Sequence, residues 1–260
     1  LAANIMRLNN IISPRNYYVR LFLNGEYIGI RHIEESYSRE LIEASKKRYG
    51  PIFKKNEPNG GVFGSQRYDL TSPNYWLNTN KKIADEGITL LEITQQNPNL
   101  IKDYFDLSLW AKYFAITDVL NIYHGSVGKS VNLYLNPVTG LIEPAFYDGH
   151  HLAGDFSNFL LIDFINKNEI ECEWICYEKE WYNAFFLNSD KSIDKEFYTK
   201  YYKELERLVS NKYTEGIIQK QLNKLSPIRG HFYRELNRFD GIFFAGPLPH
   251  IARISKFKNK

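Results

Sequence analysis

The sequence predicts an α+β fold, with a strand-rich part over residues 1–80 and a mainly helical part over residues 81–260. Residues 17–34 alternate in polarity around an Asn-Gly pair, which is typical of a β-hairpin. Most later segments space their apolar side chains as helices do. The chain has 260 residues, of which 43% are apolar and 24% charged, so it is long enough to bury a sizeable core.

The N-terminal part contains a predicted hairpin, a short helix and a further strand. The hairpin turns at Asn24-Gly25. Ser38 precedes RELIEASKKR, whose helix we expect to end near the following Gly-Pro pair. PIFKK (51–55) is typical of a strand, and the Asn-, Gly-, Pro- and Ser-rich residues 56–80 predict a long loop.

The C-terminal part contains predicted helices and a second hairpin. One helix covers residues 81–96, interrupted by Gly87, and Asp106 caps a helix over LSLWAKYFAITDVL. A turn with Pro and Gly joins the strands VNLYL and LIEPAFYD, and the second strand ends at Asp148. Further helices are predicted at about 169–187, 194–210 and 213–224.

Acidic, basic and metal-ligating side chains concentrate between residues 118 and 151. Asn132 lies in the first strand of the second hairpin, and Asp148 ends the second strand. Together they offer hard oxygen ligands suited to Mg²⁺, which also takes phosphate oxygens from a substrate. In the alternative interpretation Asp148 starts a turn, and the side chain of Asn132 forms a hydrogen bond with the backbone of a loop.

Two residues near the end of the helix 107–120 are candidate general bases. The imidazole of His124 would accept the proton of a hydroxyl nucleophile, or it caps the helix end. Asp118, about one turn earlier, would orient His124 or be the base itself. A hydrolase in which His124, His150 and His151 use a metal ion is a further alternative.

Several charged residues are candidates for binding a nucleotide. GSVGKS (125–130) resembles a phosphate-binding loop, but it lacks the first Gly and precedes a strand instead of a helix. Lys129 would contact phosphates as part of a flexible cationic loop, or is solvated. Lys54 and either Glu34 or Glu35 resemble a Lys–Glu pair that contacts nucleotide phosphates. Charged residues of these types are also typical of solvated strand ends.

Composition excludes some function classes. A net charge of +3 from 33 basic and 30 acidic residues gives no reason to expect nucleic-acid binding. No window is apolar over the ~18 residues that span a membrane. Cys172 and Cys176 are expected to be plain thiols. The chain begins at Leu1 with no basic-then-apolar leader, so we expect a fragment or a processed form.

Several segments together resemble the CotH kinase family, the atypical protein kinases of bacterial spore coats. They are the NGEYIG hairpin followed by an acidic residue, the GPIFKK strand, WAKYFAITDVLNIYHG, and the NLYLNPVTGLIEPAFYDG hairpin. The resemblance covers roughly residues 17–210. This chain departs from the spore-coat members at two positions. They have an Asp where this chain has His124, and they tend to have a further Asp where this chain has His150. The identity of the general base therefore stays open between Asp118 and His124.

The resemblance implies a reduced, two-lobed protein-kinase-like fold that binds ATP and Mg²⁺ or Mn²⁺. Asp148 would then be the metal-binding aspartate, Asn132 the metal-site asparagine, Lys54 the nucleotide-contacting lysine and Glu35 its partner. The implied activity is transfer of the ATP γ-phosphate to Ser or Thr of a protein, such as a cell-surface or coat protein outside the bacterial cytoplasm. The alternative is a nucleotide-binding pseudokinase that serves surface assembly.

Overall fold

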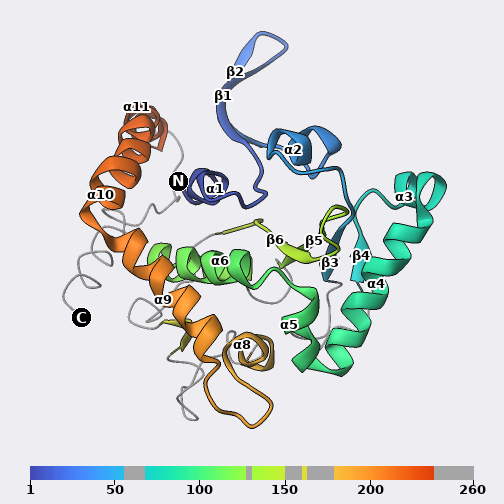
Figure 1. Ribbon diagram of the computed structural model, residues 1–260. Coiled ribbons are helices and arrows are strands. Elements are labelled where there is room, and N and C mark those ends of the chain that lie inside the picture. The colour runs from blue at the N-terminus through green and yellow to red at the C-terminus, as the bar shows by residue number, and fades with distance from the viewer. Residues whose placement is uncertain (56–67, 127–130, 150–159, 163–178, 237–260) are drawn as a thin grey trace.

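The fold is α+β, as the sequence predicts. The computed structural model describes residues 1–55, 68–126, 131–149, 160–162 and 179–236. A two-stranded and a four-stranded sheet, both antiparallel, accompany a larger set of helices (Figure 1). No helix in these ranges is both long and apolar enough to cross a lipid bilayer.

The described strands and helices have the following bounds. The strands are β1 (Asn16–Leu23), β2 (Glu26–Glu34), β3 (Ile52–Lys55), β4 (Tyr68–Leu70), β5 (Asn132–Leu135) and β6 (Ile142–Ala145). The helices are α1 (Ala2–Leu8), α2 (Arg39–Ala44), α3 (Pro73–Thr79), α4 (Lys81–Gln96), α5 (Ile101–Tyr104), α6 (Leu107–Leu120), α8 (Lys179–Phe186), α9 (Lys195–Val209), α10 (Asn211–Tyr213) and α11 (Gln219–Leu236). Short turns of helix are η1 (Pro98–Leu100), η2 (Tyr123–Ser126) and the π-type η6 (Thr214–Ile218).

The four-stranded sheet joins the two parts of the chain. Its order is β4-β3-β5-β6, so β3 and β4 come from the first 80 residues and β5 and β6 from the remainder. A division of the chain near residue 80 stays a prediction. Whatever the division, the strands on either side of it share one hydrogen-bonded ladder.

The hairpin β1–β2 and the helices α4, α6 and α9 confirm the sequence-based expectations. Gly87 does not interrupt α4. It is buried, and a Cβ there would lie 2.3 Å from the ring of Phe53, so the close approach of helix and sheet requires glycine. The helix after Ser38 is shorter than expected and ends at Ala44.

Other expectations were wrong. The predicted loop 56–80 contains β4 and α3, because residues 68–70 pair with β3 and Pro73 stands in the first turn of a helix. The strand expected to reach Asp148 ends at Ala145, where the next N–H donates to Ile12 O at 2.7 Å. The helices α1 and α5 were missed, and the helix predicted to end at residue 224 continues to residue 236.

The helix α6 forms the centre of an aromatic core. Asp106 caps it, since its Oδ1 accepts from Leu109 N at 2.9 Å. Trp110 is fully buried, donates from Nε1 to Ile142 O at 3.1 Å, and packs edge-on against Trp181 of α8 with 5.2 Å between ring centroids. Aromatic rings from α6, α8 and α9 thus supply much of the buried apolar area, and each contributes a few kcal/mol.

Asp118, in the last turn of α6, is fully buried and links three other segments. Its Oδ1 accepts from Tyr123 OH at 2.7 Å and from Leu161 N at 2.9 Å. Its Oδ2 accepts from Tyr201 OH on α9. A buried carboxylate is costly unless hydrogen-bonded, so these donors hold α6, η2 and α9 in one arrangement.

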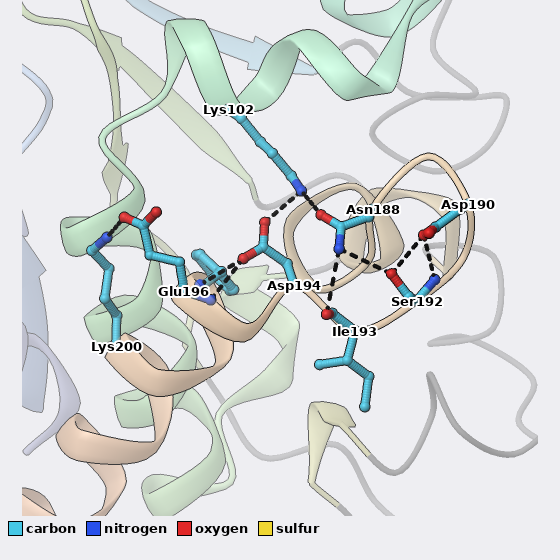
Figure 2. Close-up of polar contacts among 9 residues, drawn as sticks. Lys102, Asn188, Asp190, Ser192, Ile193, Asp194, Glu196 and Lys200 are labelled. Carbon is cyan, nitrogen blue, oxygen red and sulfur yellow. Dashed lines mark hydrogen bonds and ion pairs between the residues drawn. The ribbon is translucent and has the colours of Figure 1, made fainter.

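The connection between α8 and α9 is fixed by a polar network (Figure 2). Asp194 caps α9, and its Oδ1 accepts from the backbone N–H groups of Glu196 and Phe197 at 2.9 Å. Lys102 of α5 donates to Asp194 Oδ2 and, at 2.9 Å, to Asn188 Oδ1. One lysine therefore ties α5 to both ends of this loop.

We expect Asp194→Ala to lower the free energy of unfolding by about 1–2 kcal/mol at neutral pH, because it removes the cap of α9. Burial alone would raise the pKa of Asp194, but hydrogen bonds from Lys102 and from the Phe197 N–H outweigh it and leave the pKa below its ordinary value. The stabilisation is therefore complete above the unfolded pKa of about 4 and is lost as pH falls below it. Urea unfolding from pH 7 to pH 3 measures this.

The control is Glu206→Ala, at an exposed position of the same helix, which should change the free energy by less than about 0.5 kcal/mol. A difference between wild type and Asp194→Ala that does not shrink toward pH 3 contradicts the assignment of the cap.

We expect Tyr201→Phe to destabilise the protein by about 1–3 kcal/mol, because it removes a donor from the buried carboxylate of Asp118. Tyr202→Phe is the matched control, since Tyr202 is exposed on the same helix. Urea midpoints of the two variants give the comparison, and equal midpoints would show that Asp118 does not depend on Tyr201.

Candidate functional site

A pocket of about 500 Å³ opens where the end of β2 meets the four-stranded sheet. Its size is in the range of small-molecule sites. Three residues predicted from the sequence, Glu35, Lys54 and Asn132, line it, together with Glu34 and Tyr147. Segments that are distant in the sequence therefore meet at one cavity.

The sheet places Lys54 and Asn132 side by side. Lys54 of β3 is directly opposite Asn132 of β5, and opposite Asp69 of β4 on its other side. Residues opposite one another in an antiparallel sheet point to the same face, so these polar side chains form one row. Their neighbours Phe53 and Leu133 point to the other face, into the core.

Asp148 is held beside the pocket by the segment that precedes it. Tyr37 OH donates to Phe146 O at 2.6 Å, and Tyr147 lines the pocket. Asp148 itself is exposed and has a positive φ of 48°. Gly149 packs on Phe146, since a Cβ there would lie 2.1 Å from the ring. The Asp-Gly pair is thus fixed by a close contact that only glycine allows.

Two carboxylates repel each other at this pocket. Burial at the rim raises the pKa of Glu34, and the negative charge of Asp148 raises it further, against an opposing effect of His32. Burial and then the same two carboxylates also raise the pKa of Tyr147. A cation between Glu34 and Asp148 would relieve this repulsion.

The oxygen donors of the pocket fit a divalent cation. Glu34 and Asp148 offer carboxylates and Asn132 a carboxamide, which are the hard ligands that Mg²⁺ prefers. Among the described residues no group of three or more His, Cys, Asp and Glu side chains is suited to hold a metal ion. A cation here would therefore need oxygen atoms from Asn132 and from a bound ligand.

Glu35 lines the pocket, but its carboxylate is paired with Arg15 and not with Lys54 as expected. Arg15 Nε donates to Glu35 Oε2 at 2.7 Å, and a second guanidinium nitrogen contacts Oε1. The hydrogen bond from Arg15 lowers the pKa of Glu35. The fork of a guanidinium matches a carboxylate better than an ammonium does. Lys54 Nζ instead lies 5.8 Å from the ring centroid of Tyr147.

The two candidate bases differ in position. The turn η2, which contains His124, lies against the pocket wall, since a Cβ on Gly125 would be 2.6 Å from Tyr147 O. Asp118 lies in the core, where its hydrogen bonds favour a structural role over that of a base. The side chain of His124, with Lys129, His150, His151, Cys172 and Cys176, falls outside the described part of the structure.

The sequence did not point to some residues of the pocket. Tyr37, Tyr147, Thr71 and Ser72 line it, and no charge or spacing signal separates them from other aromatic or hydroxyl residues of the chain. Glu34 was considered only as a partner for Lys54. Its position near Asp148 depends on where β2 ends relative to the sheet, which no local pattern reveals.

Comparison with known proteins identifies the family. No curated protein matches the chain. The family model described as CotH kinase protein matches residues 1–242 of the 260 residues. The match includes both sheets and every described segment of the pocket. The protein therefore belongs to the CotH kinase family.

Proposed function

We propose that the protein is an ATP-dependent kinase that transfers the γ-phosphate to Ser or Thr hydroxyls of a partner protein. The observation that supports this most directly is the pairing of Lys54 with Asn132 on adjacent strands of one pocket, with Glu34 and Asp148 beside it. Membership of a kinase family supports the reaction class.

The candidate residues at and near the pocket divide the work of binding the phosphates and the metal ion. Lys54 neutralises phosphate charge, as the lysine of a kinase sheet does, and Lys129 adds a second contact. Asn132 and Asp148, with Glu34, hold Mg²⁺ or Mn²⁺. When bound, the ion offsets the negative charge of the phosphates.

The hydroxyl oxygen of the acceptor attacks the γ-phosphorus, the bond to the β,γ-bridging oxygen breaks, and ADP leaves. His124 accepts the hydroxyl proton, which is a contribution of typically 10²–10⁴-fold to the rate. Asp118 acts indirectly, because it holds Tyr123, the neighbour of His124, through a hydrogen bond of 2.7 Å. Most of the acceleration then comes from positioning and charge stabilisation.

We expect Mg²⁺ and a non-hydrolysable ATP analogue at 100 times the Kd to stabilise the protein by about 2.7 kcal/mol, which raises Tm by roughly 5–10 °C. Lys54→Met should lose most of this shift, because it removes the lysine that lies opposite Asn132 in the pocket. Lys82→Met, an exposed lysine on α4, should keep it in full. Differential scanning fluorimetry gives all three values.

Transfer of labelled phosphate to a protein acceptor separates binding from catalysis. His124→Ala should keep the Tm shift and lose about 10²-fold or more in rate. No Tm shift in the wild type with either metal ion would overturn the proposal of nucleotide binding. A shift without any transfer would overturn the proposed kinase activity.

A further inference from the structure

The hairpin β1–β2 extends away from the rest of the molecule (Figure 1) and exposes an unusual number of large apolar side chains. These are Tyr17, Tyr18, Leu21, Phe22, Leu23, Tyr27 and Ile33. An isolated two-stranded sheet is marginally stable, and a contiguous exposed apolar surface is typical of an interaction site. The hairpin therefore has the character of a binding element.

The C-terminal end of α11 contacts β2. Glu235 Oε2 accepts from Ile30 N at 2.8 Å, a bond that a neighbouring strand would otherwise supply. Gly29 makes room for this contact, since a Cβ there would lie 3.2 Å from the same oxygen. The carboxylate of Glu235 is thus engaged by the backbone.

A second pocket, of about 380 Å³, lies between the hairpin and α11. Its walls are Arg20, Phe22 and Tyr27 of the hairpin and His231, Arg234 and Glu235 of α11. The strand register explains why these three hairpin residues share one wall: Phe22 is opposite Tyr27 and is on the same face of the hairpin as Arg20. Two aromatic rings and two guanidinium groups therefore face one cavity.

The charge of this pocket favours an anion. Arg20 makes no ion pair with any described residue, and Arg234 donates to Gly230 O at 3.2 Å and contacts His231 Nδ1 at 3.1 Å. The one acid in the lining, Glu235, accepts from Ile30 N. Guanidinium groups with no carboxylate partner bind carboxylates and phosphates through charge-assisted hydrogen bonds.

The strand β2 leads from this pocket to the candidate nucleotide site. This strand ends at Glu34, which lines that site, and Ile30, opposite Arg20, is four residues earlier. Four residues of extended chain span about 13 Å. A peptide that lies along the hairpin would place an anionic side chain near Arg20 and a hydroxyl about four residues away at the nucleotide.

We propose that the cleft between β1–β2 and α11 docks the protein substrate through the carboxylate of an Asp or Glu side chain, about four residues from the Ser or Thr that is phosphorylated. This rests on the proposed kinase function. In this arrangement the exposed aromatic side chains of the hairpin contact apolar residues of the docked substrate segment.

The test uses fluorescein-labelled peptides with one Ser and, four residues away on either side, Glu, phosphoserine or Gln. Fluorescence anisotropy measures binding to the full chain in the presence of Mg²⁺ and a non-hydrolysable ATP analogue. The Glu peptide should bind about tenfold more tightly than the Gln peptide. A preference for the phosphoserine peptide alone, with equal binding of the Glu and Gln peptides, would overturn the assignment of a carboxylate.

Arg20→Gln should remove this preference and leave the binding of the Gln peptide unchanged. Lys203→Gln, an exposed charge on α9, is the matched control and should keep the preference. The Arg20→Glu variant should instead bind most tightly a peptide in which Lys replaces the anionic residue. This charge reversal provides a second test if Arg20→Gln folds poorly. Equal binding of the anionic and neutral peptides by the wild type would overturn the docking proposal.

Phosphate transfer to the same peptides separates the two proposals. Charge-dependent binding without transfer would contradict the kinase function and leave docking standing. Transfer with the same kcat/KM for all peptides would contradict docking and leave the kinase function standing.

Discussion

The buried carboxylate of Asp118 is the interaction on which the arrangement of the helices and the site depends. It receives hydrogen bonds from η2, from residue 161 and from α9, and it stands at the end of the central helix α6. Without these donors a charge would be left in the aromatic core, which is strongly unfavourable. The hydrogen bond from Tyr123 fixes η2, and Gly125 of this turn lies against the pocket wall, since a Cβ there would be 2.6 Å from Tyr147 O.

The four-stranded sheet positions the polar side chains of the pocket. Its inner strands β3 and β5 bring Lys54 and Asn132 together, while the opposite face packs into the core through Phe53 and Leu133. The position of the polar row is therefore set by the same register that buries the apolar residues, because a shift of one residue would exchange the two faces. The strand pairing that forms the core therefore also forms the pocket.

Local signals predicted much of the fold, including the Asn24-Gly25 hairpin, the Asp106 cap and the helix α9. Signals of the same kind missed β4, whose three residues become a strand only by pairing with β3. For the site, residue chemistry pointed to Lys54 and Asn132, which line one pocket, and to Asp118, which lies in the core. A carboxylate that stabilises a core and one that takes a proton look alike in a sequence, since burial comes from tertiary packing.

The central claim is that Lys54, Asn132 and Asp148 surround the phosphates of a bound nucleotide. Crystals grown with Mn²⁺ and a non-hydrolysable ATP analogue test it most directly, since anomalous scattering locates the manganese. We predict a manganese peak in contact with oxygens of Asn132 and Asp148, and phosphate oxygens within hydrogen-bonding distance of Lys54 Nζ. A nucleotide bound at another surface, or a manganese peak away from both residues, would contradict the account.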